Sequence, residues 1–336
     1  MSLRIAKPGL LTTVQDRGRH GLQHLGVVTS GAMDPAAYEL ANALVGNRDG
    51  EAALEVTLLG PTIELGCDAL VALCGAEFEA EVEGAKFPAD RPVLVKAGSR
   101  VAMRRAVRGT RAYLAIAGGI AIEPLLASRS TCLPAGFGGF GGRALRSGDV
   151  LPLAADAAQL ASERYQRLAS RAGIRDGVSS VRWSAPTPTL PDHQPIVLHA
   201  MPGRHYDDFD AQAQRAFFDL AWRISPDSDR MGFRLTGPQL ARARGGEILS
   251  EPTCLGTVQV PANGAPIVLM ADHQTTGGYP KIAEVAGADV ARLAQLAPGA
   301  SVRFARCTLA EALELRAALK ARIDAALRGI SWEYDE

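Results

Sequence analysis

Residues 77–84 have the sequence EFEAEVEG, in which acidic and small or apolar residues alternate strictly. Phe78, Ala80 and Val82 fall on one side of this segment, and four glutamates fall on the other. Because successive side chains of a strand point to opposite faces, a period of two predicts a half-buried β-strand. We interpret the glutamates as the solvated face of that strand, the alternative being a functional acidic patch.

Short apolar runs continue on both sides of this strand. The chain has 336 residues, and its 35 glycines and 20 prolines recur at short intervals. Glycine and proline interrupt regular structure, so this pattern predicts many short strands joined by turns. The further strands expected are 54–58, 70–74, 93–95, 101–104, 113–117, 196–199, 247–250, 257–260, 267–270 and 302–304.

A helix near the N-terminus has clear start and stop residues. Asp34 followed by Pro35 is typical of an N-cap and a first helical residue. Apolar residues then recur at helical spacing until Gly46. Helical patterns also cover residues 154–170 and 207–224.

The C-terminal segment predicts a further helix. Thr308 and Glu311 have the spacing of a capping box, and leucine and isoleucine follow at four-residue intervals. We expect this helix to stop at Gly329 and to pack on the body of the protein, the alternative being a surface reserved for a partner.

A proline-rich segment separates two lobes of similar character. Residues 184–195, SAPTPTLPDHQP, contain four prolines in twelve residues, a density that resists both helix and central strand. We therefore expect an N-terminal lobe at 1–155, a helix and proline-rich connection at 156–195, a C-terminal lobe at 196–306 and a C-terminal helix at 307–330.

Composition narrows the class of protein. Apolar residues make up 47% of the chain, and Lys plus Arg equal Asp plus Glu at 36 each. A net charge of zero argues against a nucleic-acid or anionic-membrane partner. Five cysteines without a CxxC pair argue against a disulfide framework or a structural zinc site. No signal-peptide pattern is present, and the longest apolar stretch falls short of the roughly 18 residues of a membrane span. We therefore expect a cytoplasmic protein.

Two motifs resemble known sites without the context those sites require. Residues 136–141, GFGGFG, match the GxGxxG pattern, but a turn and a strand follow where a dinucleotide site requires a helix. The remaining alternatives are a backbone loop bordering a ligand and a plain turn. His20 and His24 are four apart, yet glycines surround them, so a helical metal site is not expected and no metal is evident.

Residues 271–281, ADHQTTGGYPK, combine an unusual set of functional groups after a buried-looking strand. Asp272 supplies an anionic acceptor, Gln274 an amide, and Lys281 a cation. Gly277 and Gly278 allow close approach of the backbone to a ligand. The set suits an amide or urea-like ligand, or a transferred carboxylate or phosphoryl group. The structural alternative is a strand–turn–strand with a local Asp–Lys pair.

Five segments together resemble one family. TVQDRGR, GVVTSGAMD, SDRMGFRLTGP, SEPTCLGTVQVP and ADHQTTGGYPKIA occur in the order of the allophanate hydrolase subunit 2 family, also called biotin-dependent carboxyltransferase domain proteins. The resemblance extends from about residue 3 to about residue 304. It implies an α+β fold, mainly β with several helices, made of two cyclophilin-like β-barrel lobes. It also implies a sister subunit of the allophanate hydrolase subunit 1 type.

The resemblance implies an enzymatic role in a complex. The chain contains no biotin-carboxylase region and no biotin-attachment motif, so it is more similar to the 5-oxoprolinase branch of the family, whose members serve an ATP-dependent hydrolase of a small cyclic amide. ATP would then be used in the complex. One alternative is a carboxyltransferase subunit that transfers a carboxyl group from carboxybiotin to urea or a related amide. Another is a non-catalytic module that regulates a partner.

The resemblance also suggests site residues. Asp34 has an alternative role as an N-cap, and pairs such as Arg17 with Asp16, or Arg234 with Glu251, have the alternative role of bracing loops. The residues expected to be catalytic are Asp272 and Lys281, and those expected to bind substrate are Gln274, Thr276, Tyr279, Ser30, Asp34, Arg230, Glu251, Gln15 and Arg17.

Overall fold

The computed structural model describes residues 1–169, 172–175, 178–188, 194–244 and 246–335. The chain folds into two compact units, each with its own hydrophobic core. The proline-rich boundary expected at 184–195 includes residues 189–193, which lie outside the described residues. Unit 1 consists of Met1–Gly18, Asp34–Thr189 and Arg322–Glu336, and unit 2 consists of Arg19–Met33 and Leu190–Ala321.

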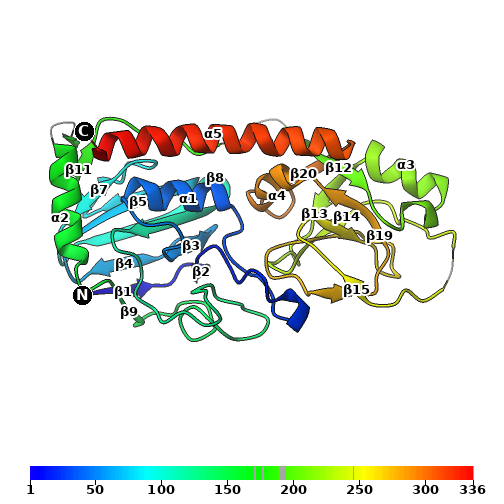
Figure 1. Ribbon diagram of the computed structural model, residues 1–336, viewed down its shortest axis with the longest axis horizontal. Helices are drawn as coiled ribbons and strands as arrows, with labels where there is room; N and C mark the ends of the chain where they lie inside the picture. Colours follow the sequence, from blue (N-terminus) through cyan, green and yellow to red (C-terminus); the bar gives the residue numbers. More distant parts are fainter. Residues whose placement is uncertain (170–171, 176–177, 189–193, 245, 336) are drawn as a thin grey trace. The chain divides into compact units, whose positions relative to one another are not determined.

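Unit 1 is built on an 11-stranded sheet (Figure 1). Its main path runs β10-β11-β7-β5-β8-β4-β1-β9, with β3 branching from β8 to pair with β2, and with β6 pairing with β5. The strands are β1 Ser2–Lys7, β2 Leu11–Gln15, β3 Ala53–Thr57, β4 Thr62–Leu65, β5 Ala69–Val82, β6 Ala85–Lys86, β7 Val93–Val95, β8 Arg100–Ile116, β9 Val150–Pro152, β10 Ala172–Arg175 and β11 Val178–Val181.

The long antiparallel pair β5–β8 carries the alternation seen in the sequence. Phe78, Ala80 and Val82 are buried, as predicted. Their acidic neighbours meet arginines of β8: Glu81 accepts from Arg104 at 2.7 Å, and the equivalent pair from Glu79 spans 3.0 Å. The strands expected separately at 70–74 and 77–84 are one strand, because register shifts near Gly75 and Phe78 let the pairing continue.

Unit 2 contains a closed barrel of seven strands in the order β12-β19-β16-β17-β14-β13-β20. Parallel pairing of β12 with β20 closes it. A separate two-stranded sheet, β15 with β18, lies in the same unit. The strands are β12 Ile196–Pro202, β13 Ala221–Ile224, β14 Gly232–Thr236, β15 Glu251–Pro252, β16 Thr257–Gln259, β17 Ile267–Leu269, β18 Thr276–Gly277, β19 Lys281–Val285 and β20 Ser301–Arg306.

Two helices of unit 1 confirm the sequence interpretation. Helix α1, Pro35–Leu44, begins where Asp34 accepts a hydrogen bond from the Ala37 amide at 3.2 Å. Helix α2, Ala157–Leu168, fills the centre of the pattern at 154–170. Both helices pack against β5.

Three predictions in unit 2 and at the C-terminus were wrong in their boundaries. Helix α3 covers only Ala211–Asp219, because Asp210 caps it and β13 takes the residues after it. Helix α5, Leu309–Asp335, continues through Gly329, since Ile330 is buried and the Tyr334 hydroxyl donates to the Leu44 carbonyl at 2.7 Å. The strand expected at 247–250 is not formed, and pairing begins only at β15.

The fold is therefore α+β, as expected, and unit 2 provides a closed β-barrel. Helix α4, Gly287–Ala294, follows β19 directly and packs near β12. Short 3-10 helices occupy Gln23–Leu25 and Tyr206–Asp208. Among the residues described, no helix is long and apolar enough to cross a membrane.

Candidate functional site

A layer of polar side chains lies on one face of the β16–β19 pair in unit 2. Val258 opposite Ala283 belongs to the hydrophobic core of the barrel. Because side chains alternate along a strand, the neighbouring pairs point away from that core. These pairs are Gln259 opposite Lys281 and Thr257 opposite Glu284. We call these four residues, together with Glu251 and Gln274, the polar layer.

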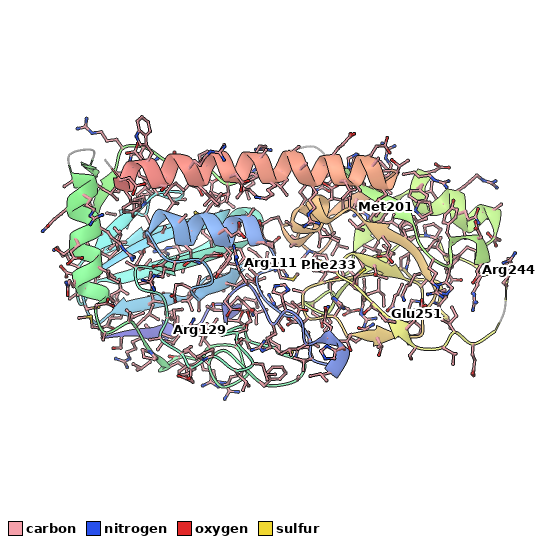
Figure 2. All side chains as sticks on the ribbon, in the orientation of Figure 1. Arg111, Arg129, Met201, Phe233, Arg244 and Glu251 are labelled. Carbon is pink, nitrogen blue, oxygen red and sulfur yellow. The ribbon has the colours of Figure 1, made fainter. Side chains whose placement is uncertain are left out.

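Lys281 is the cation of the polar layer and is only 4% exposed. Its Nζ donates to Glu251 Oε1 at 2.6 Å and to the Pro252 carbonyl at 2.8 Å. Arg204 also pairs with Glu251, at 2.9 Å. The hydrogen bond from Lys281 is the largest cause that lowers the pKa of the Glu251 carboxyl, so this group is ionised at neutral pH. Figure 2 shows Glu251 on β15.

Two glutamine amides converge beside Gly277. Gln274 Nε2 donates to Gln259 Oε1 at 3.1 Å. Gln259 is 2% exposed, and its Nε2 has no hydrogen-bond partner among the residues the structure describes. A Cβ atom on Gly277 would come within 2.6 Å of Gln259 Nε2 and 3.1 Å of Gln274 Nε2. Glycine at this position therefore allows both amides to reach the backbone.

The segment after Gly277 borders a hollow in the same unit. Gly278, Tyr279 and Pro280 line a pocket of about 690 Å³ together with residues such as Arg242 and Val260. Tyr279 is half exposed at its rim. Residues 277–280 thus contact the polar layer at one end and an open pocket along the rest of their length.

A second carboxyl group of the layer is held in a different state. Glu284 Oε2 accepts from the Thr257 hydroxyl at 2.7 Å and from Cys254 Sγ at 3.5 Å. Burial raises the pKa of the Glu284 carboxyl above its ordinary value. The layer thus contains one carboxyl with a lowered pKa and one with a raised pKa, an arrangement that enzymes use to separate acid and base roles.

Asp272 lies in a separate, fully buried ion pair. Its two carboxylate oxygens accept from Arg230 Nε and Nη2 at 3.0 and 3.1 Å. Arg230 Nη2 also donates to the Gly31 carbonyl at 2.6 Å. The neighbouring Ser30 is 6% exposed, has a positive φ of 54°, and its hydroxyl has no partner among the described residues. The pair thus fixes the loop that contains Ser30.

His273 connects the two groups. Its Nδ1 lies 3.2 Å from the Thr253 hydroxyl and 2.7 Å from the Gln274 carbonyl. Burial lowers the pKa of its imidazole. A neutral histidine here orders the turn between Asp272 and Gln274.

Three expected site residues lie in unit 1. Gln15 is fully buried, and its Nε2 donates to the Thr131 carbonyl at 3.1 Å, while its Oε1 has no partner among the described residues. Asp34 caps helix α1. Arg17 is half exposed and pairs with Glu39 at 3.2 Å.

The two loop-bracing pairs considered from the sequence are not formed. Asp16 accepts from the hydroxyls of Ser128 and Ser130 at 2.6 and 2.5 Å instead of pairing with Arg17. Glu251 pairs with Lys281 and Arg204 instead of Arg234. In both cases a partner distant in sequence replaces the expected one.

Known proteins resemble this chain over almost its whole length. A family model described as carboxyltransferase domain, subdomain A and B, matches residues 25–306. The chain is 41% identical to the C subunit of 5-oxoprolinase from Escherichia coli (strain K12), over 94% of both proteins. It is 38% identical to the corresponding 5-oxoprolinase protein of Haemophilus influenzae, over 90% of this chain and 91% of the relative. The chain belongs to the carboxyltransferase-domain family.

Solved structures of larger enzymes contain a similar region. The Kluyveromyces lactis urea carboxylase matches with a TM-score of 0.85 and 30% identity, over 97% of this chain and 29% of that one. The K. lactis urea amidolyase matches with the same TM-score and 29% identity, over 97% of this chain and 20% of that one. The carboxyltransferase-domain fold is therefore shared with enzymes of which this chain spans less than a third.

The sequence prediction found part of the site in this family member. Lys281, Glu251 and Gln274 come together in the polar layer, and Arg230, Asp272 and Ser30 come together around the buried ion pair. Thr276 on β18 and Tyr279 are exposed beside them. The roles assigned to these residues stay predictions.

Two residues of the layer were missed. Gln259 and Glu284 lie in segments that were singled out, TVQVP and YPKIAEV, but each was taken for part of a strand. The available signal was a polar side chain inside an otherwise apolar strand, in register with another polar residue.

Proposed function

We propose that this chain is a subunit of an ATP-dependent amidohydrolase complex of the 5-oxoprolinase type. The observation that supports the proposal most is identity of 41% across 94% of both this chain and a protein named as the C subunit of 5-oxoprolinase. In this reaction the lactam of 5-oxoproline is opened by water to glutamate, coupled to hydrolysis of ATP. The site is shared with a sister subunit of the allophanate hydrolase subunit 1 type, in the cytoplasm.

The polar layer has the groups that such a reaction requires. A lactam carbonyl gains negative charge when its oxygen is activated, and a desolvated ammonium close by stabilises that charge. Lys281, which is 4% exposed, takes this role in the proposal, with Glu251 holding it in place. Glu284, whose pKa is raised by burial, holds a proton that can move to the departing ring nitrogen. ATP binds within the complex.

Asp272 has a different role in this proposal. Both of its oxygens are engaged by Arg230 in a site without solvent. A carboxylate held in this way has no spare lone-pair direction aimed at a substrate without losing the pair. Asp272 therefore positions the loop 271–281, and Lys281 acts on the substrate.

The experiment combines the purified chain with its partner subunits. We expect ADP release that depends on 5-oxoproline, together with glutamate formation. The matched variants are Lys281→Met, which removes the buried ammonium, and Lys320→Met on the exposed face of α5. No glutamate from a folded, assembled wild-type complex would refute the proposal.

A carboxyltransferase role is the second candidate, favoured by the family description and by the structural match to a urea carboxylase. In that role the amide acceptor would be urea and the donor carboxybiotin. Carboxylation of urea in the presence of a carboxybiotin donor, with no turnover of 5-oxoproline, would support it. A third candidate, a non-catalytic regulatory module, requires that Lys281→Met leave the partner's activity unchanged.

A further inference from the structure

The Gln259 amide is the least satisfied polar group of the polar layer. Its Oε1 accepts from Gln274 at 3.1 Å, but its Nε2 has no hydrogen-bond partner among the described residues, although the side chain is only 2% exposed. Leaving a buried donor without an acceptor costs about 1–3 kcal/mol. Such a group in a native site calls for an acceptor that arrives from outside the chain.

The position of this donor is defined by its neighbours. Gln259 lies opposite Lys281 in the β16–β19 register, and Gly277 lies opposite Glu251 in the β15–β18 pair. Both glutamine Nε2 atoms approach the point where a side chain on residue 277 would begin, at 2.6 and 3.1 Å. Two N–H donor groups therefore meet beside the ion pair of Lys281 and Glu251, next to the segment that borders the 690 Å³ pocket.

The chemistry of this donor pair selects its ligand. Two neutral amides, beside a lysine already neutralised by a glutamate, suit a neutral oxygen with a strong dipole. A free carboxylate would be better served by an uncompensated cation. An amide carbonyl meets this requirement.

We infer that Gln259, supported by Gln274, binds the carbonyl oxygen of the amide substrate and sets specificity for a ring or urea carbonyl. The identity of that substrate as an amide rests on the function proposed above. Gln259 Nε2 donates the direct hydrogen bond, and Gly277 keeps the space in which this bond forms. The carboxylate of 5-oxoproline, by this inference, is bound elsewhere.

Substitutions separate this role from a purely structural one. Gln259→Leu removes the donor, Gln259→Glu keeps the shape but replaces the N–H donor by an acceptor, and Gly277→Ala displaces an intact Gln259. In the assembled complex, each is expected to raise the KM for 5-oxoproline about 10-fold, with a smaller change in kcat. The matched control is Gln212→Glu, on the exposed face of α3, which leaves both constants unchanged. Melting temperatures of the full chain identify any variant that fails to fold.

Competition assays test the carbonyl directly. 2-Pyrrolidone has the lactam carbonyl and no carboxylate, whereas proline has the ring and carboxylate and no lactam carbonyl. We expect 2-pyrrolidone to compete with 5-oxoproline in the wild-type complex and to lose this ability in Gln259→Leu. Competition by proline that disappears in Gln259→Leu would show that the pair binds the carboxylate, and unchanged KM in the folded Gln259 variants would also overturn the inference.

The two proposals fail separately. If the wild-type complex turns over 5-oxoproline and the Gln259 variants keep its KM, only the inference fails. If the wild-type complex is inactive, the proposed function fails, and ligand-observed NMR of the full chain with 5-oxoproline, urea and 2-pyrrolidone decides the inference. Binding that weakens in Gln259→Leu supports it, and unchanged binding, or none in the wild type, overturns it.

Discussion

Asp272→Ala is expected to unfold the protein more readily, because it leaves a buried guanidinium without its counter-charge. The side chains of Asp272 and Arg230 are 0% and 3% exposed, and two hydrogen bonds of 3.0 and 3.1 Å join them. Removing one partner of such a pair costs about 3–5 kcal/mol. At roughly 2–4 °C per kcal/mol for units of this size, we expect a fall in melting temperature of about 10 °C.

Thermal and urea denaturation of the purified full chain measure this effect. Asp227→Ala, in the same loop region but exposed, is the matched control and is expected to change stability by less than about 0.5 kcal/mol. The double variant Arg230→Met with Asp272→Leu replaces the pair by apolar side chains and should recover most of the loss. If Asp272→Ala kept the wild-type melting temperature while turnover was lost, the carboxylate would act on substrate and our positioning role for it would be refuted.

Three further predictions follow from single contacts. Lys281→Met is expected to lower turnover of the assembled complex about 100-fold, because it removes the buried ammonium that holds developing charge, as measured by ADP release. Glu284→Gln should raise the free energy of unfolding at pH 8 but not at pH 3. A folded-state pKa above the unfolded value favours folding at low pH, and this contribution is lost as pH rises through the folded pKa. Asp34→Ala should cost about 1 kcal/mol by removing the hydrogen bond to the Ala37 amide, and Asp34→Ser much less.

Each of these has an outcome that contradicts it. Equal turnover in Lys281→Met and Lys320→Met would remove Lys281 from the chemistry. A Glu284→Gln variant that gains the same stability at both pH values would show packing rather than ionisation. If Asp34→Ala abolished activity without loss of stability, Asp34 would be a substrate residue in addition to an N-cap.

Local patterns in the sequence predicted those parts of the fold that depend on neighbours along the chain. The alternation at 77–84 gave a correct strand, and Asp34 with Pro35 gave a correct helix start. Helix ends were less predictable, since α5 passes Gly329 only because Ile330 and Tyr334 find partners far away in sequence. A glycine inside a helix costs about 1 kcal/mol, which such contacts offset.

The site shows the same limit. Charged residues in unusual loops, such as Lys281 and Glu251, were identified because their side chains are costly to bury without a role. Gln259 was not, because nothing in the sequence shows that it faces Lys281 or that its amide lacks an acceptor. Register between strands determines both facts. Partner choice was likewise beyond local reasoning, as the pairing of Glu251 with Arg204 rather than Arg234 illustrates.

Closure of the barrel in unit 2 affects how the chain can associate with other chains. A closed ring of strands offers no row of unpaired backbone N–H and C=O groups, whereas a sheet with ends does. The sheet of unit 1 ends at β9 and β10 within the described residues, and the β15–β18 pair in unit 2 is only two residues long. Strand addition by another chain is therefore a property of unit 1. Unit 2 must recognise its partners through side chains and loops, where a few substitutions can change a partner without disturbing the barrel.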